Sequence, residues 1–285
     1  MPAQISRRLL LTSGLALCSS ACTQLAFLAA NIPASFGDYS RNRDLAYGIQ
    51  PLNTLDVYLP AKPAGASVVI YFHGGGWNSG SKSEYKFVGA ALAEQGYVAV
   101  LPNYRLYPQV KFPVFMQDAA QAVAWVQAHV AEWGADSQRV YLMGHSAGAH
   151  IAALLALNAD YLNAVNVDTR SLRGVIGLSG PYDFIPFSYP YMFDLFGPAE
   201  RYPQSQPINF VRAGAPRMLL LHGMQDKTVS PHNTEHLAKA LAAVGASVKA
   251  DYYPQANHGD LVAGFSIPAR GRVPVLTAVS EFIGA

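Results

Sequence analysis

One stretch of this 285-residue chain constrains its fold more than any other, and it covers residues 140–157. It starts with the apolar run Val140–Met143, continues with Gly144-His145-Ser146-Ala147-Gly148 and ends in an alanine- and leucine-rich stretch with helical spacing. This pattern predicts a buried strand, a sharp turn with Ser146 at its apex, and a helix. Glycines two positions to either side of the serine remove collisions in such a turn, so Ser146 is our candidate nucleophile.

The residue after the candidate nucleophile, Ala147, falls at the predicted N-terminus of this helix. Unpaired N–H groups and the helix dipole favour negative charge there. The Ala147 N–H is therefore a candidate donor to an oxyanion. Because a G-x-S-x-G pentapeptide also occurs in turns without catalytic function, the rest of the chain must supply a base, an acid and a second donor.

Composition favours a single α/β domain with a large core. Hydrophobic residues make up 51% of the chain and charged residues 13%, which excludes global disorder. The net charge of +2, without a cluster of basic residues, gives no sign of a nucleic-acid partner. His232 and His236 have the i, i+4 spacing of a zinc pair, but no third ligand is evident. We expect an exposed helical face there, and neither a metal nor a cofactor.

The first thirty residues have the features of an export signal. Arg7 and Arg8 precede the apolar run Leu9–Leu17, which is too short for a comfortable membrane span. The paired arginines favour the twin-arginine route, with an ordinary Sec signal as the alternative. Both cysteines of the chain lie here, and Cys22 follows small residues, as the lipid-modified cysteine of bacterial lipoproteins does.

This leader predicts where the protein works and how the chain is divided. We expect an export signal over residues 1–30 and a catalytic domain over residues 31–285. The exported protein is then either periplasmic or attached to a membrane through a lipid on Cys22, with simple cleavage and secretion as the alternative. The body of the chain contains no cysteine, so neither a disulfide nor thiol chemistry is expected there.

A second glycine-rich segment, His73-Gly74-Gly75-Gly76-Trp77, follows the apolar run Val68–Phe72, which is typical of a strand buried on both faces. Three successive glycines destabilise a helix or strand, so their presence after a buried strand requires an explanation. One reason is that the N–H groups of Gly75 and Gly76 face Ser146, where a side chain would block a substrate carbonyl. An ordinary loop is the alternative, and a phosphate cradle is disfavoured because no Lys-Ser/Thr pair follows.

Residues 73–77 and 144–148 together resemble the α/β-hydrolase superfamily and, within it, bacterial carboxylesterases of the hormone-sensitive-lipase and feruloyl/acetyl-xylan-esterase type. The resemblance extends over nearly all of residues 55–282. It implies an α/β-hydrolase fold, with a mostly parallel central sheet covered by helices on both faces. It also implies a serine hydrolase that cleaves carboxylic esters through an acyl-enzyme without a cofactor, with an oxyanion hole made by Gly75, Gly76 and Ala147.

The base and the acid follow from their places along the chain. His258 lies in the predicted loop after the last strand, where a doubly wound sheet brings the chain back beside the serine. The order Ser146, Asp226, His258 matches the order in this superfamily, and Asp226 would then hold the imidazole in the required tautomer. Asp251 and Asp183 are competing acids. Asp251 lies within a predicted strand, which makes Asp183 the more serious rival.

Other segments complete the expected architecture. The alternating stretch Leu55–Pro60 predicts a half-exposed strand near a sheet edge. Arg105 and Asp118 are interpreted as a scaffold ion pair. The Pro-, Tyr- and Phe-rich residues 181–210 follow a strand end, where active-site loops belong, and fit no regular period. We expect a short cap insert that lines the pocket, with aromatic packing of a long loop onto the body as an equal alternative.

The expected substrate is a small-molecule or polysaccharide-linked ester. Two other functions remain open at this point. One is amide hydrolysis of the arylformamidase type, because those enzymes have similar glycine-rich segments. The other is a non-catalytic hydrolase-fold surface protein. The sequence determines neither the acyl length nor the oligomeric state.

Overall fold

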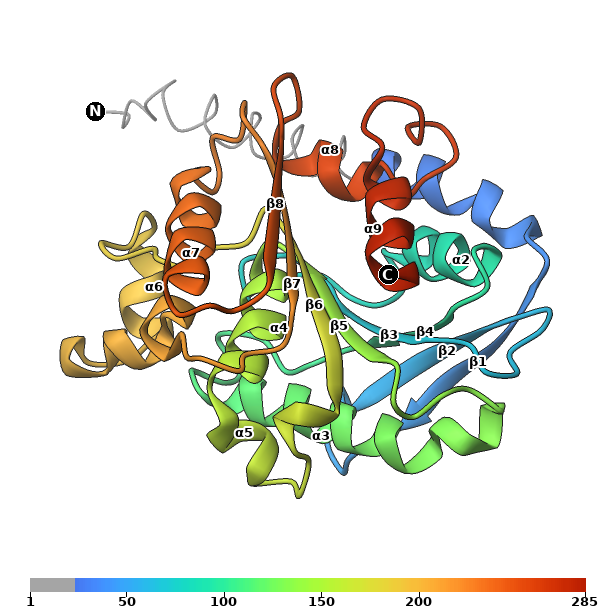
Figure 1. Ribbon diagram of the computed structural model, residues 1–285, viewed down its shortest axis with the longest axis horizontal. Coiled ribbons are helices and arrows are strands. Elements are labelled where there is room, and N and C mark those ends of the chain that lie inside the picture. Colours follow the sequence, from blue (N-terminus) through green and yellow to red (C-terminus); the bar gives the residue numbers. More distant parts are fainter. Residues whose placement is uncertain (1–23) are drawn as a thin grey trace, which may run out of the picture.

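The computed structural model describes residues 24–285. The predicted lipidation site, Cys22, and most of the predicted export signal lie outside these residues. An eight-stranded sheet with the order β1-β2-β4-β3-β5-β6-β7-β8 forms the centre of the described part (Figure 1). No helix between residues 24 and 285 combines the length and the hydrophobicity that crossing a bilayer requires.

The sheet is mostly parallel, as expected. β1 pairs antiparallel with β2, β2 pairs antiparallel with β4, and all other neighbouring strands are parallel. The strands are β1 (Tyr39–Ala46), β2 (Thr54–Pro60), β3 (Val68–Phe72), β4 (Val98–Pro102), β5 (Val140–His145), β6 (Leu172–Leu178), β7 (Met218–Gly223) and β8 (Val248–Tyr253).

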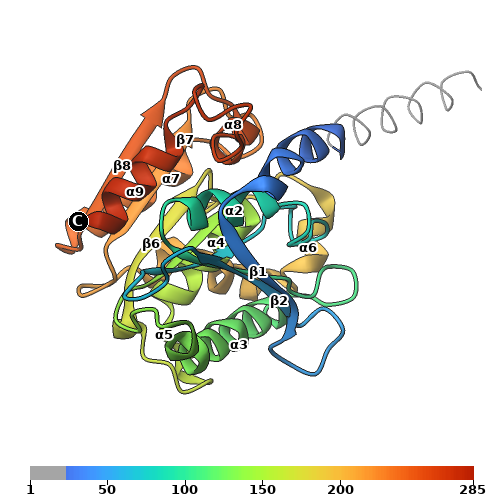
Figure 2. The ribbon, with the colours of Figure 1, turned by 90° about the vertical axis from the view of Figure 1, so that its right-hand side faces the viewer.

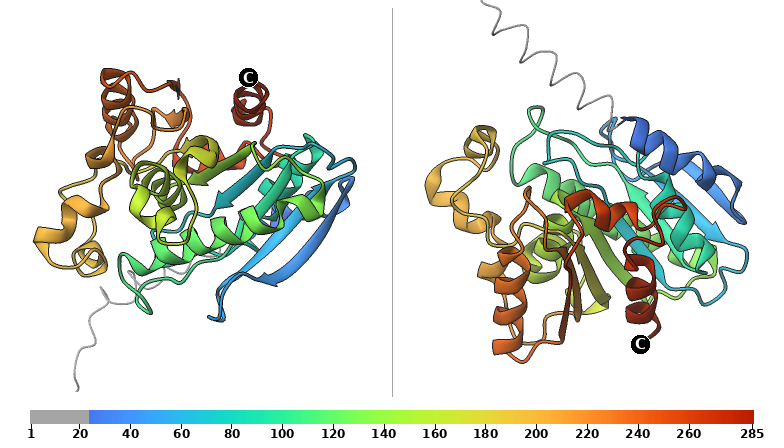
Figure 3. Two further views of the ribbon diagram at one scale, coloured as in Figure 1. Left: turned by 60° about the horizontal axis from the view of Figure 1, so that its bottom comes forward. Right: turned by 90° about the horizontal axis from the view of Figure 1, so that it is seen from above.

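Helices cover both faces of the sheet because successive side chains of the strands point to opposite sides. In β3, for example, Ile70 packs into the core on one face and Val69 into the core on the other. The first face is covered by α3, α4 and α7, and the second by α2, α8 and α9 (Figures 1 and 3). The helices are α2 (Lys86–Glu94), α3 (Val114–His129), α4 (Ala147–Leu157), α5 (Ala159–Asn163), α6 (Pro190–Leu195), α7 (His232–Ala243), α8 (His258–Ala263) and α9 (Val275–Gly284).

The predicted strand at Leu55–Pro60 is confirmed and lies next to the edge strand, but the prediction that it is half-exposed was wrong. This segment belongs to β2, which is largely buried, and β1 forms the edge with exposed charged residues. The alternation in β2 is misleading because Asp56, which looks like a solvent-facing residue, is fully buried. Its carboxylate is paired with Lys82 at 2.7 Å and with Arg41, so the charge is compensated inside the protein.

The strand register brings the functional loops together at one end of the sheet. Phe72 at the end of β3 pairs with Gly144 near the end of β5. The glycine-rich loop after β3 therefore lies beside the turn that carries Ser146. Gly223 pairs with Tyr253, so the loops after β7 and β8 also leave the sheet at the same level.

Residues 181–210 contain more regular structure than the sequence indicated. They include α6 and two 3-10 helices, Ala199–Ser205 and Pro207–Phe210. At the other end of the molecule, residues 24–31 form a helix that lies alongside α2 (Figures 2 and 3). The predicted leader thus ends in a segment that is helical and contacts the body of the protein.

Candidate active site

Ser146 lies at a strained turn between β5 and α4. Its φ of 55° and ψ of −122° are unusual for a residue with a side chain. The turn is tight because α4 crosses directly over the end of β3. A Cβ atom on Gly148 would lie 1.9 Å from the carbonyl oxygen of Phe72, so only glycine fits there. Among the described residues, the Ser146 hydroxyl makes no hydrogen bond, and Ser146 lines a pocket.

The glycine-rich loop after β3 lies beside this turn. Gly75 has a φ of 123°, and its carbonyl oxygen accepts hydrogen bonds from the N–H of Asn78 at 3.1 Å and of Ser79 at 3.0 Å. Within residues 24–285, the backbone N–H groups of Gly75, Gly76 and Ala147 donate to no other protein group. Gly75 and Gly76 line the same pocket as Ser146, and Ala147 follows Ser146 directly. All three donors therefore remain available to an oxygen beside Ser146.

The pocket over Ser146 has a volume of about 390 Å³ and is walled by residues 75–79, 181–192 and 228–233. The ring of Phe184 stacks on Trp77 with centroids 5.7 Å apart, and the hydroxyl of Tyr191 donates to the carbonyl oxygen of Gly76 at 3.1 Å. Phe187 and Phe196 of the same insert are buried against the body. Both expected roles of residues 181–210 are thus observed, since some aromatics line the pocket and others pack the insert in place.

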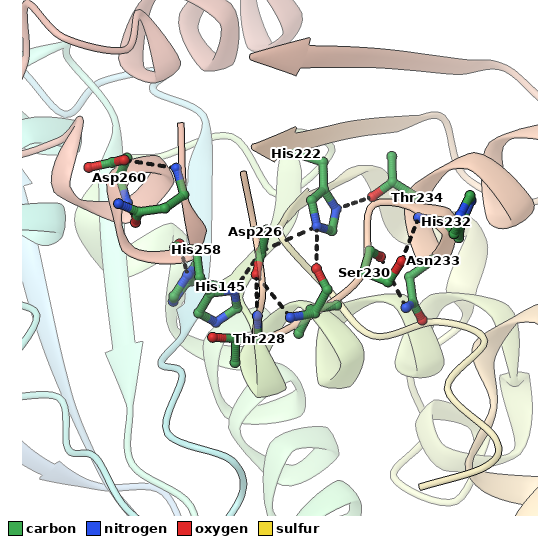
Figure 4. A network of polar contacts seen from close by, with 12 residues as sticks. His145, His222, Asp226, Thr228, Ser230, His232, Asn233, Thr234, His258 and Asp260 are labelled. Carbon is green, nitrogen blue, oxygen red and sulfur yellow. Dashed lines mark hydrogen bonds and ion pairs between the residues drawn. The ribbon is translucent and has the colours of Figure 1, made fainter. Parts of the chain in front are cut away.

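His258 and Asp226 are in direct contact (Figure 4). The Nδ1 atom of His258 lies 2.7 Å from Oδ2 of Asp226. Because a carboxylate only accepts, Nδ1 carries the proton and Nε2 of the neutral ring keeps a lone pair. The orientation of His258 is fixed by a capping box at the start of α8. Asn257 accepts from the N–H groups of Gly259 and Asp260, and the Asp260 carboxylate accepts from the N–H of Asn257 at 2.8 Å.

The carboxylate of Asp226 is held by several donors. Its Oδ1 accepts from the N–H groups of Thr228 and Val229, each at 2.9 Å. Its Oδ2 also lies 3.3 Å from Nε2 of the buried His222. Burial alone raises the pKa of Asp226, but the hydrogen bonds from His222, His258 and the backbone outweigh it and hold the pKa well below its usual value. Asp226 is therefore ionised whenever His258 could act as a base.

His145, which precedes Ser146, links the turn to the segment carrying His258. Its Nε2 lies 2.9 Å from the backbone carbonyl oxygen of His258, and the two rings are 4.6 Å apart. A carbonyl only accepts, so Nε2 of His145 carries the proton. The side chain also packs against Gly74, where an added Cβ would lie 3.0 Å from Nδ1 of His145. Burial, and then the proximity of His258, lower the pKa of His145 to about 3, so the ring stays neutral.

A second buried histidine, His150 of α4, connects the glycine-rich loop to the insert. Its Nδ1 accepts from Nε1 of Trp77 at 3.3 Å, and its Nε2 donates to the carbonyl oxygen of Ser205 at 2.7 Å. Burial lowers the pKa of His150 to about 4. The neutral ring thus links the glycine-rich loop to the insert by acting as both acceptor and donor.

The competing candidates lie in other contacts. Asp183 pairs with His236 at 2.8 Å, and His232 pairs with Glu235 at 3.0 Å on the surface of α7. Asp251 pairs with Lys249. Among residues 24–285, no group of three or more His, Cys, Asp or Glu side chains could hold a metal ion. Asp226 is therefore the acid that contacts His258.

The structure brings most of the predicted site residues together. Asp226 and His258 form a hydrogen bond, but Ser146 makes none with His258; such bonds are often long before substrate binds. Arg105 and Asp118 form the predicted ion pair, with Nε and Nη2 at 2.8 and 2.7 Å from the carboxylate oxygens.

Sequence reasoning gave no role to His145, His150 or His222. Each is a polar residue inside an apolar strand or helix, which is the signal that could have marked them.

The BD-FAE family model matches residues 55–241. The chain belongs to the BD-FAE family. This confirms the resemblance to α/β-hydrolase carboxylesterases of the hormone-sensitive-lipase and feruloyl-esterase type. The matched residues include the glycine-rich loop, the Ser146 turn and Asp226, while His258 lies beyond them.

This BD-FAE member is also similar to proteins that are named as esterases. It is 30% identical over 84% of its length to the probable isoprenylcysteine alpha-carbonyl methylesterase ICMEL1 of Arabidopsis thaliana, covering 54% of that protein. It is 31% identical over 79% of its length to esterase LipC of Mycobacterium tuberculosis, covering 62% of it. The chain thus spans a little over half the length of these relatives.

Solved structures give the same architecture. Thermogutta terrifontis esterase 2 bound to propionate is 25% identical to the chain, with a TM-score of 0.70, over 86% of this chain and 93% of that one. A truncated carbohydrate esterase from gut microbiota is 21% identical, with a TM-score of 0.72, over 87% and 97% of the two chains. The predicted α/β-hydrolase fold is confirmed.

Proposed function

We propose that this protein is a carboxylic ester hydrolase that works through an acyl-enzyme on Ser146. The observation that carries the proposal is the hydrogen bond of 2.7 Å between His258 and Asp226, on segments next to the strained Ser146 turn. It leaves Nε2 of His258 unprotonated, which is the state that a general base requires. The esterase names of the relatives support the same reaction class.

In the first step, the Ser146 oxygen attacks the ester carbonyl carbon while His258 Nε2 takes the hydroxyl proton. The carbonyl oxygen becomes an oxyanion beside the N–H groups of Gly75, Gly76 and Ala147. The bond to the alcohol oxygen then breaks, and His258 returns the proton to the leaving alkoxide. Asp226 stabilises the imidazolium formed in between. Each oxyanion donor contributes on the order of 3 kcal/mol in comparable enzymes.

In the second step, a water molecule replaces the alcohol. His258 removes a proton from the water as its oxygen attacks the acyl carbon. The bond between the acyl carbon and the Ser146 oxygen then breaks, and the serine regains its proton from His258. The products are the carboxylic acid and the free enzyme, so the site needs no cofactor for this reaction.

We infer that the natural substrate is an ester with a short acyl group. The pocket of about 390 Å³ is lined in part by the aromatic side chains of Trp77, Phe184 and Tyr191. The structural neighbour from Thermogutta terrifontis holds propionate, a short acid, and another neighbour is a carbohydrate esterase. A small-molecule ester or an acyl group on a polysaccharide both satisfy this chemistry.

We also propose that the protein acts outside the cytoplasm, in the periplasm or attached to a membrane through a lipid on Cys22. The paired arginines, the apolar run Leu9–Leu17 and the small residues before Cys22 support this proposal. Metabolic labelling of the wild type and of Cys22→Ala with a fatty acid tests it. Label that is absent from the wild type, or retained in Cys22→Ala, contradicts lipidation at this residue.

Turnover of p-nitrophenyl acetate by the wild type and by Ser146→Ala tests the catalytic proposal. We expect the variant to lose activity by a factor on the order of 10⁴ or more. A wild type without turnover would support a non-catalytic protein, and a variant with the wild-type rate would exclude Ser146 as the nucleophile. Faster hydrolysis of a formanilide than of an acetyl ester would instead favour the arylformamidase type.

A further inference from the structure

The helix over residues 24–31 is fixed to the body of the protein along one side. The ring of Phe27 lies 5.0 Å from that of Tyr85 in an edge-to-face arrangement. The side chain of Asn31 donates to the carbonyl oxygen of Glu84 at 2.9 Å and accepts from the N–H of Phe87 at 3.1 Å. These contacts with the start of α2 determine which side of the helix faces outward.

The outward side consists of large apolar residues. Leu25, Leu28, Ile32 and Phe36 are 64%, 56%, 53% and 85% exposed, and we call these four residues the N-terminal apolar face. Their spacing of three, four and four residues places Leu25, Leu28 and Ile32 on one stripe of the helix. A solvated helix normally carries charged residues on this side, because its apolar stripe faces the core.

No charged residue is present anywhere near this face in the sequence. The chain has no Asp, Glu, Lys or Arg between Arg8 and Asp38. The outer surface of the helix therefore lacks the groups that keep an exposed helix in water. Contiguous exposed apolar surface of this kind marks a site of interaction with a partner or a membrane.

An open apolar groove adjoins the same helix. It has a volume of about 500 Å³ and lies between residues 26–30 on one side and α8 with the following loop on the other. Phe27, Phe87 and Val262 contribute to its apolar lining, and Arg272 is the basic residue in it. Ile267, on the loop that borders the groove, is 53% exposed. An apolar surface with a cationic group suits the acyl and phosphate parts of an anionic phospholipid.

We propose that the N-terminal apolar face and this groove rest on a phospholipid bilayer, with the helix lying in the plane of the headgroups. The sequence that precedes the described residues favours a bilayer over other partners. The predicted lipid carrier Cys22 is two residues before the helix, and the apolar run Leu9–Leu17 precedes it. A lipid on Cys22 would hold the first turn of the helix at the membrane surface.

In a chain that retains residues 24–36, the contact requires neither that lipid nor the proposed esterase activity. A single acyl chain binds membranes only weakly, so stable attachment takes a second element. The apolar face supplies this element from the folded protein itself. It also fixes the orientation of the domain, because the helix is tied to α2 rather than connected by a free linker.

Vesicle flotation of the full chain carrying Cys22→Ala tests the proposal without the lipid. The vesicles contain phosphatidylglycerol and phosphatidylethanolamine. In this background, Leu25→Ser with Leu28→Ser should lower the partition coefficient about five- to tenfold, because interfacial binding scales with the apolar area that is buried. The matched control is Ile49→Ser with Val244→Ser, which removes two other exposed apolar side chains and should leave binding unchanged.

Hydrogen exchange gives a readout that is independent of residues 1–23. When vesicles are added, hydrogen exchange in the peptide covering residues 24–36 should slow. Exchange in the control regions around Ile49 and Val244 should stay unchanged. Unchanged exchange at residues 24–36 overturns the proposal, because this readout does not depend on the apolar run Leu9–Leu17 that the full chain keeps. The protein could instead form a dimer in solution that Leu25→Ser with Leu28→Ser converts to a monomer without changing flotation. This result also overturns the bilayer proposal and shows that the N-terminal apolar face binds a second copy of the chain.

Folding and activity are checked separately. Thermal unfolding confirms that the double variants are folded, and their turnover of soluble p-nitrophenyl acetate should equal that of the wild type. If neither the wild type nor the variants hydrolyse the ester, the esterase proposal fails, whereas the flotation result remains valid.

Discussion

Replacing His145 tests whether this residue positions the catalytic base. In His145→Leu, the partly buried carbonyl oxygen of His258 loses its donor at 2.9 Å. Leaving a buried acceptor unsatisfied costs about 1–3 kcal/mol. If this free energy is added to the activation free energy when His258 reaches its catalytic position, kcat falls by about 5- to 150-fold.

The conservative variant His145→Gln should recover most of this loss, because its side-chain amide can still donate to the His258 carbonyl. The KM should stay near the wild-type value in both variants, since His145 does not line the pocket. Steady-state kinetics with p-nitrophenyl acetate separates the two constants. The acidic limb of the pH profile should keep its position in His145→Gln, because the pKa of His145, about 3, lies below the range assayed.

Three outcomes would refute this reasoning. In the first, His145→Leu has the wild-type kcat, so the hydrogen bond has no role in catalysis. In the second, KM rises while kcat is unchanged, which places His145 in substrate binding. In the third, Gln and Leu are equally impaired although both variants unfold at the wild-type denaturant concentration, which leaves ring packing as the only contribution.

The remaining predictions concern the acid, the turn and the response to pH. Asp226→Asn should lower kcat on the order of 10³- to 10⁴-fold with little change in KM. The kcat of Asp183→Asn should stay within about tenfold of the wild-type value. A larger loss of kcat in Asp183→Asn than in Asp226→Asn would make Asp183 the acid. Gly148→Ala should lower the free energy of unfolding by roughly 1–3 kcal/mol or more, because the new Cβ would lie 1.9 Å from Phe72 O. The control Gly284→Ala in α9 meets no atom within 4 Å and should be nearly neutral. Urea unfolding of the two variants measures the difference. Burial lowers the pKa of His73 and His150 from 6.5 to about 4. Below pH 6.5 the unfolded chain therefore binds protons that the native state does not bind. The free energy of unfolding should decrease by about 2 kcal/mol per histidine as the pH is lowered from 7 to 5. Denaturant unfolding at both values checks this, and a smaller loss is expected for His150→Gln; a pH-independent stability of the wild type would contradict it.

Local sequence patterns were sufficient for the turn and for the strands that position it. Val140–His145 is buried along its whole length, and Gly148 and Gly75 occupy positions where only glycine fits or is unstrained. The strand and the turn could be predicted because their residue types and spacing lie within a few residues of one another, whereas the close approach of Gly148 to Phe72 O follows only from the fold. The order of Ser146, Asp226 and His258 along the chain could likewise be read once the resemblance to a family was recognised.

Contacts between distant residues decided the rest. Asp226 and Asp183 both follow strand ends, and only the folded chain shows that His258 meets the first and His236 the second. His145 gains its partner 113 residues further along the chain. Asp56 looked solvent-facing in an alternating pattern, yet Lys82 and Arg41 allow it to be buried.

The sequence alone therefore determined the candidate residues Ser146, Asp226 and His258 and the turn that carries Ser146, because spacing and residue type act locally, but it placed His258 in a loop, whereas His258 is the first residue of α8. Tertiary structure determined which of them meet, which histidines stay neutral inside the core, and how residues 181–210 shape the pocket. The physical reason is that hydrogen-bond partners and burial depend on how distant segments pack, and no local pattern contains that information.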